Sequence, residues 1–346
     1  MKERIVAIMQ ADVDALLAGE LGDWLAEQST MRSQAKTTAW TRLAMGGAAY
    51  VAILGFVWIA LNASFVFAGF VAFGGLVGLA FWCLLPIVNA TKQIKIGINS
   101  AIARSLGVTY QHDVATGPEF AAARTYGLVP SFARAQFEDR WSGELEGHRF
   151  SLYEAHLERR ETSRENRTRY VTVFRGAIID MDFGRPFTST TLLQRAGAHK
   201  RWFGLGRAKD SVAFDGHQLD LVDQVHPAFE DVFALYSDDQ VDARVLVNPA
   251  YIEHLIALES AFKGDALRAL LSKGRVIVAV ESSVLFESGS LSEHKDRENV
   301  TQAAEQFAAL ARLALAINQT ERGSALGHAG PADARALGTP SGLKRR

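Results

Sequence analysis

The sequence predicts an α+β protein, with an N-terminal helix and a two-helix transmembrane hairpin followed by a cytosolic domain of antiparallel strands with flanking helices. Three observations predict this class. An uncharged run extends from Leu43 to Thr91, segments with a period of two begin near Trp141, and helical apolar stripes recur after Tyr236.

Composition narrows the kinds of chemistry to expect. The 346 residues have a formal net charge of −1, so overall charge gives no argument for a nucleic-acid partner. The single cysteine, Cys83, excludes a disulfide within the chain and a metal cage built from cysteines. No Gly-x-Ser-x-Gly, His-Glu-x-x-His or Walker A motif is present. We therefore expect no cofactor and no metal.

Residues 1–42 predict an amphipathic cytosolic helix. Apolar residues recur there at steps of three and four, with Gly19 and Gly22 weakening the middle of the pattern. Such a helix could pack on the domain, pair with another subunit or lie on the membrane. Its acidic residues disfavour the last of these, since membrane-surface helices are usually basic.

The uncharged run predicts two membrane spans, at about 43–61 and 65–88, because about 20 apolar helical residues cross a bilayer core. Basic residues flank the run on both sides, and the connecting loop has no charge, so the positive-inside bias places both termini in the cytoplasm and the chain in the inner membrane. The flanking basic residues are Arg32, Lys36, Arg42, Lys92, Lys95 and Arg104. Because neither span contains Asp, Glu, Lys, Arg or His, the hairpin is predicted to be an anchor within the bilayer rather than a transport path.

Gly74 and Gly78 have the small-xxx-small spacing that lets helix backbones approach closely. They are candidates for helix packing, either of the two spans on each other or of one hairpin on another in a homo-oligomer.

Residues 92–320 are predicted to form the cytosolic α+β domain. Helices are expected over 91–106, with Gly107 as the stop, and over 118–126. Strands are expected over 141–146, 149–159 and 170–183, and 188–194 is expected to pair with the last of these. Residues 276–280 and 284–286 are expected to form a further hairpin.

Two capping patterns predict helices between the strands. Ser237 and Gln240 have capping-box spacing, and Asn248-Pro249 has the N-cap and first-turn residues of a second helix. A last helix is expected over 295–318. Residues 321–346 are rich in Gly, Ala and Pro and are predicted to be a disordered tail.

Several short segments of the chain carry a resemblance to known proteins. They are Trp141-Ser142-Gly143, Glu154-Ala155-His156-Leu157, Val173-Phe174-Arg175-Gly176, Asp182-Phe183, the stretch from Tyr236 to Arg244 and Asn248-Pro249. Together these segments resemble a bacterial family of two-span membrane proteins with a cytosolic domain of unknown function. The resemblance covers roughly 95–290 and implies a similar layout, but no activity and no catalytic residues.

Four residues are weak catalytic candidates. Glu154 and His156 are two apart on one predicted strand, and Asp180 and Asp182 are two apart on the next. If the two pairs shared a face, they could hold a divalent metal or act as an acid and a base. The alternative is a polar, solvent-facing side of the sheet.

Two further groups are charged. A basic and aromatic segment, near an anionic inner leaflet, could contact the membrane, or it could be a solvated loop. Its candidates are Lys200, Arg201, Trp202, Phe203 and Arg207. Asp238, Asp239 and Asp242 form a carboxylate cluster, in which a helix cap explains Asp238 and Asp239 better than ligand binding does. Arg244 could pair with Asp239 or Asp242, or reach an adjacent strand.

From these features the sequence predicts a membrane-anchored cytosolic interaction or regulatory module. We expect it to be neither a transporter nor an enzyme. Its expected partners are the lipid bilayer and a protein or second copy bound through the hairpin and the N-terminal helix. The alternatives are a metal-dependent hydrolase and a sensor of lipid headgroups or small molecules.

Overall fold

The computed structural model describes residues 19–59, 65–145, 147–162, 168–183, 186–196, 200–202, 205–208, 210–214, 216–223, 232–282, 285 and 294–327. These residues divide into two compact units. The helical unit takes the described residues within Val6–His112 and Phe286–Glu305, and the sheet unit takes those within Asp113–Leu285 and from Gln306 onward.

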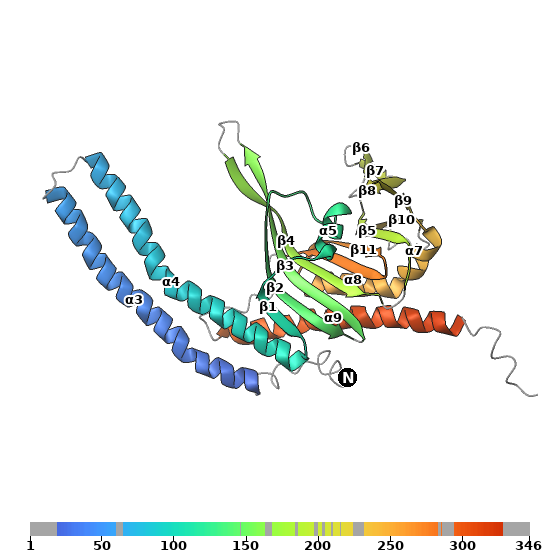
Figure 1. Ribbon diagram of the computed structural model, residues 1–346, viewed down its shortest axis with the longest axis horizontal. Coiled ribbons are helices and arrows are strands. Elements are labelled where there is room, and N and C mark those ends of the chain that lie inside the picture. The colour runs from blue at the N-terminus through green and yellow to red at the C-terminus, as the bar shows by residue number, and fades with distance from the viewer. Residues whose placement is uncertain are drawn as a thin grey trace, which may run out of the picture. The chain divides into compact units, whose positions relative to one another are not determined.

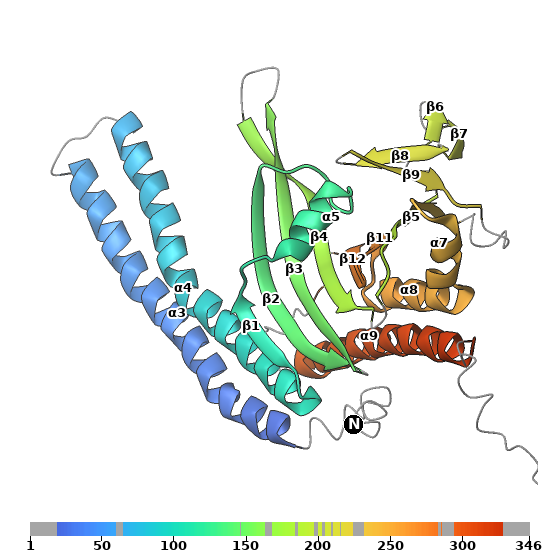
Figure 2. The ribbon, with the colours of Figure 1, turned by 45° about the vertical axis from the view of Figure 1, so that its right-hand side comes forward.

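Two long helices, α3 (Glu20–Ile59) and α4 (Phe65–Leu106), dominate the helical unit and lie side by side in Figures 1 and 2. Both are long and apolar enough to cross a membrane, and only 6% of each apolar window is buried. The core helices of soluble proteins bury such surface, so the exposed apolar side chains of α3 and α4 require another explanation.

Close contacts hold α3 and α4 together at several levels. The Tyr50 hydroxyl donates to the Ala72 carbonyl oxygen. Arg42 donates from Nη1 to the Trp82 carbonyl oxygen at 2.9 Å, and its guanidinium lies 5.1 Å from the centre of the Trp82 ring.

The end of α4 confirms the predicted stop. Gly107 adopts a φ of 72°, its N–H donates to the Arg104 carbonyl, and the Val108 N–H donates to the Ala103 carbonyl at 2.9 Å. A residue other than glycine is strained at such a φ, which explains why the helix ends there. Strand β1 (Thr109–Asp113) follows at the boundary of the two units.

The sheet unit is built on a large antiparallel sheet, which together with the flanking helices confirms the α+β class (Figure 2). From β2 onward the strand order is β2-β3-β4-β12-β11-β5-β10-β9-β8. The strands are β2 (Arg134–Leu145), β3 (His148–Thr162), β4 (Thr168–Asp182), β5 (Thr190–Arg195), β8 (Ser211–Phe214), β9 (His217–Leu221), β10 (Phe233–Ser237), β11 (Asp265–Ser272) and β12 (Arg275–Glu281). A separate small hairpin contains β6 (Lys200–Trp202) and β7 (Leu205–Ala208).

Helices cover both faces of β2 and β3. On one face, Phe120 of α5 (Pro118–Thr125) packs edge-on against Phe137 at 4.7 Å. On the other, Phe307 of α9 (His294–Gly327) packs against Trp141 at 4.8 Å. Phe137 and Trp141 lie on opposite faces because their partners on β3, Ala155 and Leu152, are three residues apart and so point to opposite sides of the sheet.

The structure corrects the predicted N-terminal helix. Over the described residues, the helix predicted within 1–42 and the first span are one continuous helix, α3, that begins just after Gly19. The Gly22 N–H donates to the Gly19 carbonyl at 2.9 Å, so Gly19 marks the start of the helix rather than a weak middle. Residues 1–18 lie outside the described range.

The predicted hairpin of 276–280 with 284–286 is wrong. β12 pairs instead with β11 and with β4, through a turn at Lys273-Gly274 in which both residues have positive φ, 53° and 72°. Such a two-residue turn suits an antiparallel hairpin, but lysine in the first position gives little sequence signal for it. Likewise β5 pairs with β10 and β11 rather than with β4.

Helix ends were predicted with mixed success. α8 (Pro249–Ala261) begins at the predicted cap, where the Asn248 side chain accepts from the Tyr251 N–H at 2.9 Å. α7 (Gln240–Leu246) is capped by Asp239 instead of Ser237, because Ser237 is the last residue of β10. α9 continues to Gly327, so the first residues of the predicted tail are helical, and residues 328–346 lie outside the described range.

Candidate functional site

The pairing of β3 with β4 separates the four catalytic candidates. Glu154 pairs with Ala177 and His156 with Arg175, whereas Asp180 pairs with Ser151. Paired residues share a face, and neighbouring residues on a strand do not. Glu154 and His156 therefore lie on one face of the sheet and Asp180 and Asp182 on the other, so the structure does not bring the four together.

On the first face, Glu154 and His156 border a small polar hollow of about 120 Å³ on β2, β3 and β4. Glu154 is 8% exposed and forms an ion pair from Oε1 to Arg175 Nε at 3.0 Å. The His156 Nε2 lies 2.9 Å from the Thr172 hydroxyl. Gln136 and Glu138 complete the lining. Because the Glu154 carboxylate is already paired with the Arg175 guanidinium, it is poorly suited to activate a nucleophile. The hollow is better suited to recognise a small polar group.

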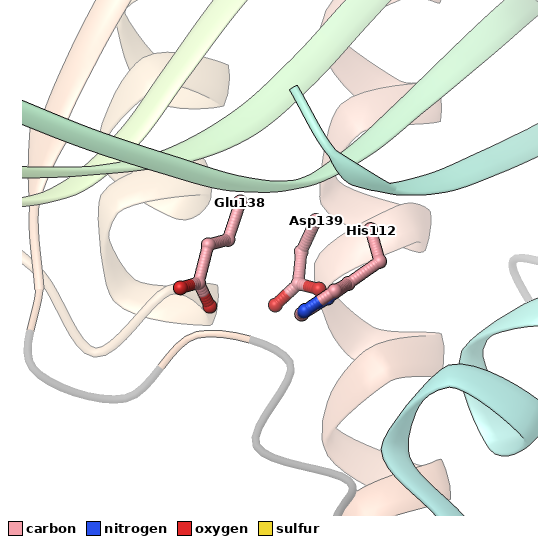
Figure 3. Close-up of side chains that lie close together, drawn as sticks. All are labelled: His112, Glu138 and Asp139. Atoms are coloured by element: carbon pink, nitrogen blue, oxygen red, sulfur yellow. The ribbon is translucent and has the colours of Figure 1, made fainter. Parts of the chain in front are cut away.

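A β-bulge shapes the rim of this hollow. The register of β2 on β3 shifts between Glu138 and Trp141, and Asp139 within the shift has a φ of 57°. Figure 3 shows the result, with the side chains of Glu138 and Asp139 emerging together from β2. His112, which the figure also labels, belongs to the helical unit. Bulges re-aim side chains in this way.

On the opposite face, a buried polar cluster lies beneath α5. The Glu119 carboxylate accepts from the Gly117 N–H at 2.9 Å and pairs with Arg140 at 3.3 Å. The Arg140 guanidinium lies 5.2 Å from the centre of the Tyr153 ring, which is fully buried. These contacts fasten the start of α5 to the sheet.

Asp180 belongs to the same face and is 3% exposed. It forms an ion pair with Arg275, whose Nε also lies 3.9 Å from Asp182. Burial raises the pKa of Asp180 to about 6; the Arg275 guanidinium opposes this rise, and the Glu119 carboxylate adds to it. Burial and then the Glu119 carboxylate raise the pKa of Tyr153. A raised carboxyl pKa also occurs at catalytic sites, but here the Asp180 carboxylate is engaged in its ion pair with Arg275.

Sequence reasoning missed Glu119, Arg140, Tyr153 and Arg275 as members of this cluster. Glu119 carried one signal, an acid in the first turn after Pro118, which suits a helix N-terminus. The other three come from three different strands, and only the sheet order brings them together.

The three aspartates near α7 contact donors within the chain. Asp239 accepts from two N–H groups of α7, Asp238 accepts from the Thr190 N–H at 2.7 Å, and Asp242 accepts from the Ser189 hydroxyl. Arg244 donates to the Asp223 carbonyl at 3.3 Å rather than to Asp239 or Asp242. Asp239 therefore caps α7, whereas the predicted capping role of Asp238 is wrong, because its carboxylate binds the backbone N–H of Thr190.

For the candidate membrane-contact residues, the structure describes only the backbone. Lys200, Arg201 and Trp202 form β6 and Arg207 lies in β7, but their side chains and all of Phe203 lie outside the described part of the chain.

Gly74 and Gly78 lie on α4, and a Cβ at either position would meet nothing within 4 Å among the described residues. The close approach of α3 to α4 uses other glycines. A Cβ at Gly75 would lie 2.6 Å from the Tyr50 ring, and one at Gly46 would lie 2.5 Å from Leu79.

Comparisons with known proteins add little about activity. A family model described as "Protein of unknown function (DUF3137)" matches residues 172–319, less than half of the chain. This supports the resemblance to a domain of unknown function in the C-terminal part. No curated protein matches.

One solved structure, described as the mycobacterial trehalose monomycolate transport factor A, TtfA, aligns with 62% of this chain and 93% of its own. The sequence identity is 12% and the TM-score 0.31.

Proposed function

We propose that this chain is a membrane-anchored interaction module. In this proposal, α3 and α4 cross the inner membrane as a hairpin and hold the sheet unit at the cytoplasmic surface, where it binds a protein partner or a second copy. The observation that carries the proposal is the exposed apolar surface of α3 and α4, joined to a unit whose described buried acids are engaged in contacts within the fold.

The exposed side chains on α3 and α4 support membrane insertion. Large apolar residues stay more than half exposed along the predicted spans, among them Val51, Phe56, Phe70, Phe73 and Phe81. In water such a surface is unfavourable by about 25 cal/mol per Å². In hydrocarbon the same surface is favourable, and a helix satisfies its own backbone hydrogen bonds.

Charge supports the orientation. The uncharged run has basic residues on both flanks and none in the loop, so both ends are proposed to be cytoplasmic. The contact of Arg42 with Trp82 joins the flank of α3 to α4, at a level where an amphipathic ring and a guanidinium suit the headgroup region.

The absence of Asp, Glu, Lys, Arg and His from 43–91 supports an anchor over a transport path. The metal-dependent hydrolase loses support, because its four residues lie on two faces of the sheet.

Purification of the full chain in mild detergent, followed by identification of bound proteins, tests the interaction role. We expect one partner, or a second copy, to co-purify reproducibly and to be lost when the sheet unit is deleted. Failure to recover a partner, together with substrate turnover abolished by Glu154→Gln, would contradict the proposal and favour an enzyme.

A further inference from the structure

The strands β3 and β4 extend beyond the rest of the sheet as a two-stranded arm, visible in Figures 1 and 2. On one side, the pairing with β2 ends at Glu158, and on the other, the pairing of β4 with β12 begins only at Gly176. The four residue pairs from Arg159–Val171 to Thr162–Thr168 therefore have no neighbouring strand among the described residues. We define these residues as the arm.

The arm and its tip are strongly basic. Between 159 and 169 the sequence has arginine at 159, 160, 164, 167 and 169 and glutamate only at 161 and 165. In the described part, the side chains of Arg159 and Arg169 are 53% and 75% exposed. An otherwise nearly neutral chain thus concentrates positive charge on a projecting element.

Contacts within the arm hold its arginines in place. Glu161 pairs with Arg159 through one carboxylate oxygen and with Arg169 through the other, both at 3.1 Å. One acid therefore orients two guanidinium groups and neutralises only one of them. Their hydrogen bonds to Glu161 leave other N–H donors of each group directed to solvent, where they suit phosphate oxygens.

An aromatic residue accompanies the charge. Tyr170, directly opposite Arg160, is 36% exposed, and the Arg134 guanidinium stacks over its ring at 3.4 Å. Tyrosine is enriched at membrane interfaces because its ring is apolar and its hydroxyl is polar. The arm thus presents basic and amphipathic side chains together, both of which suit the surface of an anionic membrane.

We propose that the β3–β4 arm binds the phosphate-bearing headgroups of anionic lipids and so docks the sheet unit on the membrane surface. This inference rests on the proposed membrane anchoring, which keeps the arm close to a bilayer. Anionic lipids attract each nearby basic residue strongly enough to change binding by roughly fivefold. The same arginines would also attract an acidic protein, which the experiment below distinguishes.

The test uses the full chain in nanodiscs of zwitterionic lipid, mixed with vesicles of phosphatidylcholine or of phosphatidylcholine with phosphatidylglycerol. Co-sedimentation measures how the protein partitions onto the vesicles. The arm variant combines Arg159→Gln, Arg160→Gln and Arg169→Gln. The control combines Arg124→Gln, Arg149→Gln and Arg244→Gln, which removes the same charge from exposed positions elsewhere in the sheet unit.

The proposal predicts that the native chain binds only the anionic vesicles, that the arm variant binds them roughly 100-fold more weakly, and that the control stays within a few fold of the native chain. Binding of the native chain should also fall steeply with added salt. Three results would each overturn the proposal. They are an equal loss of vesicle binding in the arm variant and the control, equal binding of the native chain to neutral and anionic vesicles, and binding of the native chain to polyglutamate but not to anionic vesicles.

Alkaline extraction of native membranes tests the anchor separately. Release of the chain by alkali would contradict the proposed anchoring. The binding of the arm variant to vesicles tests only the role of the arm.

Discussion

Asp180 shows how a single residue can combine a structural role with a pH response. Its carboxylate is buried beside Arg275, and its pKa is raised to about 6 from an ordinary value of 3.8. The folded chain therefore holds this proton more tightly than the unfolded chain does. The stabilisation is fully present below about pH 4 and is lost as the pH rises through about 6.

Asp180→Asn should remove this part of the pH dependence. As the pH rises from about 4 to about 6, we expect Asp180 to lower the free energy of unfolding of the native chain by up to about 1.4 kcal/mol per pH unit. The variant should lack this contribution. Denaturant unfolding of the detergent-solubilised chain at several pH values measures it. Asp182→Asn, at a side chain that is 44% exposed, is the control and should keep most of the native slope, because Asp182 adds only the smallest of the contributions that raise the pKa of Asp180. Identical slopes in Asp180→Asn and the native chain would contradict this assignment.

Glu119 is predicted to stabilise the sheet unit through two contacts. Glu119→Ala leaves the Gly117 N–H and the Arg140 guanidinium without this acceptor, and we expect a loss of about 2 kcal/mol in the free energy of unfolding. Glu144→Ala, at an exposed position of β2, should change it by less than about 0.5 kcal/mol. Chemical unfolding of both variants makes the comparison, and equal effects would show that Glu119 is not a fastening point.

The sequence identified Glu154, His156, Asp180 and Asp182 as polar residues on neighbouring strands, and β3 and β4 are indeed neighbours. It could not predict their faces. One residue of register moves every side chain to the other face, and the register depends on where the turn and the bulges fall. The irregularity between Leu157 and Glu158 has no sequence signal of its own.

Among the elements, the α3–α4 hairpin makes the sharpest mutational comparison. Gly75→Val places side-chain atoms against the Tyr50 ring, whereas Gly74→Val extends into space free of described residues. We expect Gly75→Val to destabilise the helix pair by about 1–3 kcal/mol, in keeping with other overpacked sites. Thermal unfolding in detergent, followed by tryptophan fluorescence, measures the shift in Tm.

Gly74→Val should leave that Tm close to the native value. If it instead lowers the Tm as much as Gly75→Val, the hairpin packs through a different face of α4. A loss of oligomers in Gly74→Val, with the Tm unchanged, would support the separate prediction that Gly74 and Gly78 pack against another hairpin.

Elements with strong local chemistry were predictable. Gly107 ended α4 and Asn248 capped α8, because positive φ and side-chain capping are local demands. β11 was not predicted, although Ala269, Leu270 and Leu271 are fully buried in it. A short apolar run next to a helix fits a strand or a buried helical segment equally well, and pairing with β12 and β5 decides between them.

For the whole molecule, the two long apolar helices and the α+β class were predictable, because hydrophobic length and periodicity act over whole segments. The strand order was not, since β4 pairs with a strand almost a hundred residues later, and neither strand records that choice.

Protease accessibility of the full chain in oriented membrane vesicles shows whether α3 and α4 hold the sheet unit at the cytoplasmic face. In inverted vesicles, where the cytoplasmic face is outside, we expect digestion of the sheet unit and survival of a fragment containing the hairpin. In right-side-out vesicles the chain should stay intact. Digestion only in right-side-out vesicles, or a chain that washes off both preparations, would contradict a cytoplasmic module anchored by α3 and α4.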